Sequence, residues 1–307
     1  METRKIGSLD VSVVGVGCNN FGMRLDQAAT DEVVHAALDA GITFFDTADV
    51  YGGTQSEVFL GIALGVRRSE VVVASKFGMP LDDERFGAAP GYVRQACEDT
   101  LRRLGADWID LYQLHAPDPS VPITDTLGAL HDLQAEGKIR EIGCSNFTVA
   151  QLDGAKEAAG SLAPFRSIQN QYSLLWREPE QDGVLEACRR LGLGFLPYYP
   201  LANGLLTGKV RPGEPLPEGS RLALMAPERS AHWLSDSFSE RVGALLAYAE
   251  DLGTPILSLA FSWLLAHREV SSVIAGASNR SQVVANATAP LRLDDEVVAT
   301  LDRLTAP

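Results

Sequence analysis

The chain has 307 residues, of which 46% are hydrophobic and 21% are charged. This composition is typical of a globular protein and excludes a mainly disordered chain. The formal net charge is −14, from 26 basic and 40 acidic side chains. Nucleic acids and anionic membranes both attract clustered lysines and arginines, so neither is expected as a partner.

The cysteines and the N-terminal segment bear on compartment and metal binding. Four cysteines, at 18, 97, 144 and 188, are far apart and form no C-x-x-C motif, so buried reduced thiols are expected and a metal site is not. The first residues lack the apolar stretch of a signal peptide, and no run of 18 apolar residues occurs. We therefore expect a cytoplasmic protein without a membrane span.

Apolar runs rich in β-branched residues alternate with helical patterns along the chain. Their continuous apolar character is typical of strands buried on both faces of a parallel sheet. Strands are predicted at 11–17, 43–48, 71–76, 109–115, 140–146, 167–172, 194–199 and 271–277. Consecutive strand–helix units of this number favour a (β/α)8 TIM barrel over an open doubly wound sheet. A short N-terminal β-hairpin is expected at 3–12, and the whole chain, 1–307, is expected to be a single domain.

Several predicted helices carry signals at their ends. Thr30 is expected to cap the first helix. Capping boxes are predicted where Thr148 precedes Gln151 and where Ser237 precedes Glu240. The Pro- and Gly-rich segment 211–235 is interpreted as one long loop after the seventh strand, because it is too short for a domain.

Titratable side chains gather where predicted strands end, which is where TIM barrels carry their active sites. Three consecutive strands end at Asp46, Lys76 and His115, and Tyr51 follows Asp46 in the next turn. A buried ammonium requires an acidic partner, which Asp46 on the neighbouring strand can supply. One interpretation is a purely structural ion pair. In the other, Lys76 lowers the pKa of the Tyr51 phenol and makes it a proton donor near neutral pH.

Two further interpretations concern neighbouring residues. Asp49 lies in the turn before Tyr51, where we expect it to hydrogen-bond the local backbone. The segment 15–22 begins like a dinucleotide-binding loop, but its glycines do not follow G-x-G-x-x-G and no helix opens directly after it. This spacing disfavours a Rossmann fold.

A Schiff-base aldolase with Lys76 as nucleophile stays open as an unrelated alternative.

Seven motifs, in the same order, resemble those of the aldo-keto reductase family. They are "GITFFDTADVYG" (41–52), "ASKFG" (74–78), "DLYQLHAPD" (110–118), "GKIREIGCSNF" (137–147), "QNQYSLL" (169–175), "YYPLANGLLTGK" (198–209) and "VIAGASNRSQVVAN" (273–286). With the N-terminal hairpin they cover nearly the whole chain. The short C-terminus and "SKFG" are similar to the bacterial and potassium-channel β-subunit-like branches.

The resemblance implies hydride transfer between a nicotinamide and a carbonyl or alcohol. The catalytic tetrad of the family falls on Asp46, Tyr51, Lys76 and His115. Tyr51 would exchange a proton with the carbonyl oxygen, and Lys76, held by Asp46, would lower its pKa. His115 would orient the carbonyl through a hydrogen bond. A cofactor-binding redox sensor with little turnover is the alternative within the same family.

The resemblance also implies which residues contact the cofactor, which is expected to be NADPH, with NADH still open. These residues are Ser145, Asn146, Gln169 and Tyr198 for the nicotinamide, Leu201, Lys209 and Arg221 for the phosphates, and Gly276, Ser278, Gln282 and Asn286 for the adenosine end. Backbone N–H groups of a helix opening after Ala275 would also face phosphate. Two departures matter. Tyr199 replaces the serine of "YSPL". Gly276 and Gln282 stand where NADPH-dependent relatives often carry Lys and Arg, so a 2′-phosphate would rely on Arg280, Lys209 or Arg221.

The substrate is expected to be a small carbonyl compound or alcohol. Asn20, Phe21, Phe77 and Trp176 are the residues predicted to wall its pocket, although Trp176 is equally compatible with a packing role. Specificity lies in the loops of such a barrel, so the sequence leaves the particular substrate, the direction of the reaction and the oligomeric state open.

Overall fold

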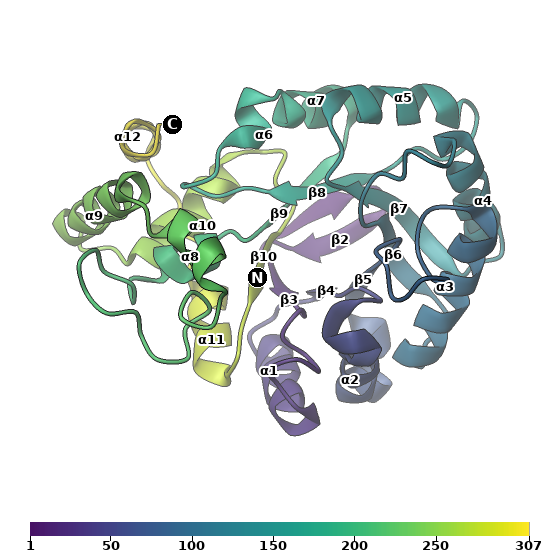
Figure 1. Cartoon of the computed structure of the whole chain (residues 1–307), viewed down its shortest axis with the longest axis horizontal. Helices are drawn as coiled ribbons and strands as arrows, with labels where there is room; N and C mark the ends of the chain where they lie inside the picture. The colour runs from purple at the N-terminus through teal and green to yellow at the C-terminus, as the bar shows by residue number, and fades with distance from the viewer. Residues whose placement is uncertain (307) are drawn as a thin grey trace.

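The computed structural model describes residues 1–306, and its centre is one curled sheet of eight parallel strands (Figure 1). The strands are β3 (Val14–Gly17), β4 (Phe44–Asp46), β5 (Val72–Phe77), β6 (Ile109–Leu114), β7 (Ile139–Ser145), β8 (Ser167–Gln171), β9 (Gly194–Tyr198) and β10 (Val273–Gly276). They pair in the order β10-β3-β4-β5-β6-β7-β8-β9. The barrel closes where Phe195 of β9 forms a parallel bridge with Val270, just before β10. The predicted TIM barrel is confirmed.

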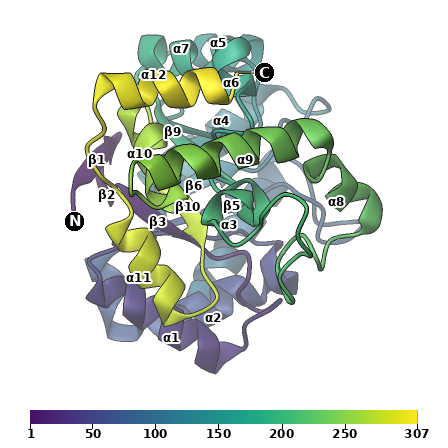
Figure 2. The ribbon, with the colours of Figure 1, turned by 90° about the vertical axis from the view of Figure 1, so that its left-hand side faces the viewer.

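Helices form the outer layer of the barrel. They are α1 (Gln27–Asp39), α2 (Gln55–Leu64), α3 (Pro90–Leu104), α4 (Ile123–Ala135), α5 (Val149–Ala159), α6 (Glu178–Gln181), α7 (Val184–Leu191), α8 (Pro227–Trp233), α9 (Asp236–Asp251), α10 (Ile256–Ala266), α11 (Arg280–Thr288) and α12 (Asp295–Leu304). Three 3-10 turns, η1 (Tyr51–Thr54), η2 (Gly65–Glu70) and η3 (Ala202–Thr207), interrupt the connections. Figure 2 shows α9 and α12 lying side by side.

The predicted hairpin is present as β1 (Thr3–Ile6) and β2 (Leu9–Ser12), which pair antiparallel. Its apolar side chains Ile6, Leu9 and Val11 are buried against inward-facing residues of the barrel, including Phe44 and Leu111. The hairpin therefore plugs the barrel from the side where the strands begin, because β3 starts immediately after it. The opposite end, where the strands finish, is left for a site.

The main core lies between the barrel and its helices, and it contains all four cysteines as buried free thiols. Among residues 1–306, no group of three or more His, Cys, Asp or Glu side chains could hold a metal ion. In the same residues no single helix is long and apolar enough to cross a membrane. The helices α9 and α10 reach the length and apolar composition of a membrane span only when they are counted together, as a bent pair.

Element ends differ from the predictions at several points. The predicted strand 11–17 is two strands, since β2 ends at Ser12 and β3 begins at Val14. Asp26, not Thr30, caps α1: its side chain accepts a hydrogen bond from the Ala29 N–H, and Thr30 is buried inside the helix. The reason is that α1 begins one turn earlier than its apolar pattern indicates.

Two capping boxes were predicted, and one of them forms. Thr148 and Gln151 bond each other's backbone at the start of α5, as predicted. The predicted box of Ser237 and Glu240 is wrong, because α9 already begins at Asp236 and no side chain caps it.

Two predicted loop features also differ. The segment 211–235 is not a continuous loop, since it contains α8. The helix expected directly after Ala275 begins only at Arg280, where the Asn279 side chain caps it by accepting from the Gln282 N–H.

Candidate active site

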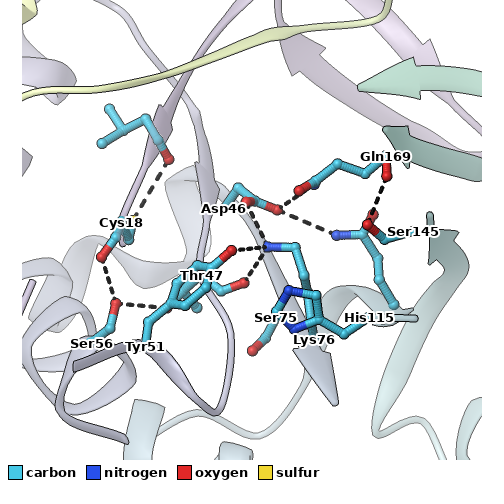
Figure 3. Close-up of polar contacts among 12 residues, drawn as sticks. Cys18, Asp46, Thr47, Tyr51, Ser56, Ser75, Lys76, His115, Ser145 and Gln169 are labelled. Atoms are coloured by element: carbon cyan, nitrogen blue, oxygen red, sulfur yellow. Dashed lines mark hydrogen bonds and ion pairs between the residues drawn. The ribbon is translucent and has the colours of Figure 1, made fainter. Parts of the chain in front are cut away.

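A buried ion pair lies at the barrel mouth where β4 and β5 end (Figure 3). Lys76 is 0% exposed and Asp46 is 3% exposed. The Lys76 ammonium donates hydrogen bonds to Asp46 Oδ2 at 2.7 Å and to the Thr47 carbonyl at 2.8 Å. Burial, the largest single influence, disfavours the ammonium, but the attraction of Asp46 and then Tyr51 outweighs it and raises the pKa of Lys76. The lysine is therefore a cation at neutral pH.

Two glutamine side chains hold the other oxygen of Asp46. Gln169 of β8 donates to Asp46 Oδ1 at 2.9 Å, and Gln113 of β6 donates to it at 3.3 Å. Gln169 was expected to contact the nicotinamide, so the structure adds an internal role to it. Gln113 was not singled out in the sequence, although it alternates inward on the strand that ends at His115. Both oxygens of Asp46 are therefore bonded, and its side chain is fixed in place.

Tyr51 reaches the same ammonium from the turn that follows β4. Its hydroxyl is 3.4 Å from Lys76 Nζ, and the ammonium lies 4.9 Å from the centre of the phenol ring. Gly52 and Gly53 follow with φ of 58° and 60°. A Cβ on Gly52 would come within 2.4 Å of the Phe21 carbonyl, so this tight turn requires glycine.

The protonation of Tyr51 differs from the expectation. Burial raises the pKa of the phenol above its ordinary value, and the lowering effect of Lys76 does not offset that burial. The expectation of a net lowering near neutral pH is wrong for this structure, because the effect of burial on the phenol is larger than the opposing effect of Lys76. Tyr51 is consequently a neutral phenol at neutral pH, which leaves it able to donate a proton.

His115 follows β6 and faces Tyr51. Their ring centres are 5.9 Å apart and the rings are nearly perpendicular, at 82°. Burial, and then the nearby Lys76 cation, lower the pKa of His115 to about 3. The imidazole is therefore neutral over the physiological range. Its Nδ1 is buried and has no hydrogen-bond partner within residues 1–306.

Asp49 does not do what its position in the turn suggested. The side chain is 1% exposed, and neither carboxylate oxygen has a hydrogen-bond partner in the described chain. The Val50 backbone N–H lowers its pKa slightly but does not reach it with hydrogen-bond geometry. The prediction of local backbone hydrogen bonding by Asp49 is therefore wrong.

A cavity of about 790 Å³ opens over these residues. Asp46, Tyr51 and His115 line it, while Lys76 lies beneath them. So do most residues expected to contact a cofactor: Ser145, Asn146, Gln169, Tyr198, Leu201, Lys209, Arg221, Gly276, Ser278, Gln282 and Asn286. The volume is in the upper part of the range of small-molecule sites, which is ~300–1,000 Å³.

The side chains of this cavity fit a nicotinamide dinucleotide. Amide groups and an aromatic ring lie near the catalytic end, at Asn146 and Tyr198. The cations Lys209 and Arg221 also belong to the lining and suit phosphate oxygens. The buried Oδ1 of Asn203, also in the lining, has no hydrogen-bond partner among residues 1–306, as expected of an acceptor left for a ligand.

Asn146 ties several of these groups together. Its side-chain amide donates to the His115 carbonyl at 3.0 Å and accepts from the Tyr198 hydroxyl at 2.9 Å. Its φ is 62°, a left-handed conformation that asparagine tolerates better than most residues. The residue therefore connects the loop after β6 with the end of β9.

The tyrosine that replaces serine in "YSPL" has a partner of its own. Arg221 stacks over the Tyr199 ring at 4.6 Å and donates to its hydroxyl at 3.1 Å. This contact joins the segment after β9 to the segment 211–235. Because Arg221 also lines the cavity, Tyr199 contributes to holding a cation there.

Arg280 differs from the other cofactor candidates. It lies outside the lining of the cavity and pairs with Asp39 of α1 at 3.2 Å, and both side chains are more than half exposed. Gln282 instead accepts a hydrogen bond from the Ser278 N–H at 2.8 Å.

Only one of the predicted substrate-wall residues, Asn20, lines the cavity. Phe21 and Phe77 are fully buried in the core, so the prediction is wrong for both. Trp176 packs against His232 and Trp233 of α8 and is not part of the lining, which corresponds to the packing role. Both phenylalanines instead belong to the main core between the barrel and its helices.

Sequence reasoning missed one basic residue of the lining, Arg24. It is exposed and follows Asn20 in the loop after β3, whose backbone folds back through the Arg24 N–H to the Asn20 carbonyl at 2.8 Å. Its position after a strand end was the available signal.

Comparisons with known proteins agree with this geometry. The sequence profile of the Aldo/keto reductase family matches residues 13–306. "Probable aldo-keto reductase 1" of Glycine max is 38% identical over 215 residues, which are 67% of this chain and only 61% of the plant protein. The structure of the glycerol dehydrogenase AKR11B4 from Gluconobacter oxydans matches with a TM-score of 0.85 at 30% identity, covering 99% of this chain and 95% of that one. The chain therefore belongs to the aldo-keto reductase family.

Proposed function

We propose that this chain is a nicotinamide-dependent oxidoreductase that interconverts a carbonyl compound and its alcohol, with the barrel acting as one domain. The observation that carries the proposal is the convergence of Lys76, Tyr51 and His115 at one end of a cavity that fits a dinucleotide. A purely structural ion pair does not account for a phenol and a neutral imidazole exposed to the same cavity.

In the reductive direction the carbonyl carbon gains a hydride and the carbonyl oxygen gains a proton. The bound nicotinamide supplies the hydride. Tyr51 gives its phenolic proton to the oxygen, and the Lys76 cation 3.4 Å away stabilises the charge that develops on the phenol. Solvent then returns a proton to Tyr51. The neutral His115 ring donates a hydrogen bond that orients the carbonyl.

The roles of the remaining residues follow from their contacts. Asp46 keeps Lys76 charged and fixes its position, and the two glutamines hold the Asp46 side chain in place. Asn146 and Tyr198 would hold the nicotinamide end of a bound cofactor, while Lys209 and Arg221 would neutralise its phosphates, since all four line the cavity. The Ser145 hydroxyl donates to the Gln169 backbone carbonyl at 2.7 Å and so links the ends of β7 and β8 at the cavity.

The test is a substrate panel with Tyr51→Phe as the variant. Purified protein is assayed with NADPH and NADH against aldehydes, ketones and diketones, and in the oxidative direction against alcohols. Glycerol belongs in that panel because a structural relative carries the name glycerol dehydrogenase. Tyr51→Phe is expected to lower turnover by ~10²–10⁴-fold, the usual value of a positioned general acid. Cofactor affinity, measured by fluorescence titration, is expected to stay unchanged.

Tyr248→Phe is the matched control, since Tyr248 lies on α9 and makes no hydrogen bond through its hydroxyl in the described chain. Wild-type turnover in Tyr51→Phe would contradict the proton-donor role. Tight cofactor binding with no turnover across the whole panel would instead favour a redox sensor. Trapping of a carbonyl substrate on Lys76 by borohydride would favour the aldolase alternative.

A further inference from the structure

A second buried polar cluster lies behind the catalytic strands, on the side facing α2 and α3. Its centre is Glu57, which is 0% exposed. Glu57 accepts from Ser75 Oγ at 2.5 Å and from Arg103 Nε at 2.5 Å, so both of its oxygens are occupied. Ser75 immediately precedes Lys76. The proposed mechanism uses none of these groups.

Asp49 completes this cluster without a partner. Both of its oxygens are buried and unbonded within residues 1–306. The titratable and charged groups that face it are Glu57 of α2, Arg103 and Tyr92 of α3, Lys76 of β5 and Tyr112 of β6.

None of these neighbours compensates a negative charge on Asp49. Arg103 is already bonded to Glu57, and Lys76 is bonded to Asp46. The hydroxyls of Tyr92 and Tyr112 make no hydrogen bond to any described residue. An ionised carboxylate in this place is therefore costly. Burial, and then the adjacent Glu57 charge, raise the pKa of Asp49 to about 7.

The backbone of Asp49 is attached to the catalytic residues. Its N–H donates to the Lys76 carbonyl at 3.1 Å, and the Tyr51 N–H donates to the Ala48 carbonyl at 3.2 Å. Asp49 lies three residues after Asp46 and two before Tyr51. A shift of this turn therefore moves the Tyr51 hydroxyl relative to the Lys76 ammonium.

We propose that Asp49 is a positioning residue that acts through its proton. The neutral carboxyl is compatible with the packed turn between Asp46 and Tyr51, and loss of the proton to solvent displaces that turn and draws the Tyr51 hydroxyl away from Lys76. Proton binding at Asp49 thereby regulates the Tyr51 proton donor. The effect on catalysis rests on the proposed function, whereas the proton binding and the displacement do not.

The first test needs no activity. The infrared spectrum of the wild-type protein is expected to show the C=O stretch of a protonated, buried carboxyl at about pH 6, lost by about pH 8, and absent from Asp49→Asn. In protein labelled with ¹³C at tyrosine Cζ, the Tyr51 signal, assigned with Tyr51→Phe, is expected to shift over the same range in wild type and not in Asp49→Asn. A wild-type spectrum without the band at about pH 6, or a Tyr51 signal that shifts equally in both proteins, overturns the proposal.

The second test uses turnover with any substrate that the panel identifies. Wild-type reduction is expected to slow by on the order of tenfold from about pH 6 to about pH 8, since small displacements of a catalytic group have effects of that size. Asp49→Asn, which resembles the neutral acid, is expected to keep its rate. Asp83→Asn, at an exposed position, is the matched control and is expected to follow wild type. An undiminished slowing in Asp49→Asn overturns the regulatory role.

Glu57→Gln provides an independent check on the wild-type Asp49 side chain. It removes the neighbouring negative charge that disfavours ionisation, so the carboxyl band is expected to disappear at a lower pH than in wild type. A band that disappears at the same pH in Glu57→Gln and in wild type would show that the Glu57 charge does not raise the pKa of Asp49. Complete absence of reductase activity leaves the spectroscopic outcomes intact, so failure of the proposed function and failure of this inference are distinguishable.

Discussion

Two aspartates three residues apart illustrate how environment decides the role of a carboxyl group. Asp46 receives hydrogen bonds from Lys76, Gln113 and Gln169. Asp49, equally buried, receives none. The difference arises because Asp46 points into the barrel and Asp49 points toward α2 and α3. A partnered acid fixes a neighbouring lysine, whereas an unpartnered acid binds a proton.

Arg280 lies outside the cavity lining, but its neighbours Ser278 and Gln282 belong to it, so Arg280 is expected to decide cofactor preference by binding a 2′-phosphate at the cavity edge. Its ion pair with Asp39 is exposed on both sides and therefore contributes little, so a 2′-phosphate can replace Asp39. Arg280→Ala is expected to raise the KM for NADPH by about tenfold, the size of one lost charge-assisted hydrogen bond, with little change for NADH.

Initial rates with both cofactors measure this preference. Arg268→Ala is the control, because Arg268 is exposed and precedes β10 at the opposite end of that strand. An equal change in the KM of both cofactors would show that Arg280 does not recognise the 2′-phosphate.

At the scale of elements, the last helix is held by one arginine in the loop after β8. Arg177 binds Glu180 through Nε and Nη2 at 2.5 Å, and its Nη2 lies 3.0 Å from Asp302 of α12. Its guanidinium stacks over the Trp263 ring of α10 at 4.6 Å. Since Arg177 is only 11% exposed, its charge depends on these partners. The loop, α10 and α12 are thus joined at one point.

Arg177→Ala is expected to lower the free energy of unfolding by about 3 kcal/mol, because it leaves Glu180 partly buried without its cation. Urea denaturation at neutral pH measures the loss. Arg303→Ala, on the same helix α12 but exposed, is expected to change stability by less than about 0.5 kcal/mol. Equal losses in the two variants would mean that the network contributes no more than a surface contact.

At the scale of the whole molecule, the barrel and the grouping of Asp46, Tyr51, Lys76 and His115 at its mouth could be predicted because both depend on local patterns. The β-branched runs locate every barrel strand to within a few residues. Asp46 ends β4, Lys76 is the last residue but one of β5, and His115 directly follows β6. Contacts between distant segments could not be predicted. Trp176 packs on α8, more than 50 residues later, and the surroundings of Asp49 come from four other elements. Phe21 and Phe77 show that a strand end does not reveal which way a side chain points.

Asp49 and His115 are expected to change the stability of the fold with pH in opposite directions. The pKa of Asp49 is raised from 3.8 to about 7, so the folded chain binds a proton that the unfolded chain lacks. Its contribution is full below the unfolded pKa and is lost as pH rises to about 7. The pKa of His115 is lowered from 6.5 to about 3, so its contribution is present above the unfolded value and is lost as pH falls.

Urea denaturation of wild type, Asp49→Asn and His115→Gln between about pH 4 and about pH 8 tests both signs. Relative to Asp49→Asn, wild type is expected to lose up to about 4 kcal/mol as pH rises through this window, since a shift of one pKa unit corresponds to about 1.4 kcal/mol. Relative to His115→Gln, wild type is expected to gain stability as pH rises from about 4 to about 6.5. A difference from Asp49→Asn that stays constant with pH would show that Asp49 is ionised in the folded barrel. That result would also overturn the proposed positioning role of Asp49, because this role requires a proton on its buried carboxyl group.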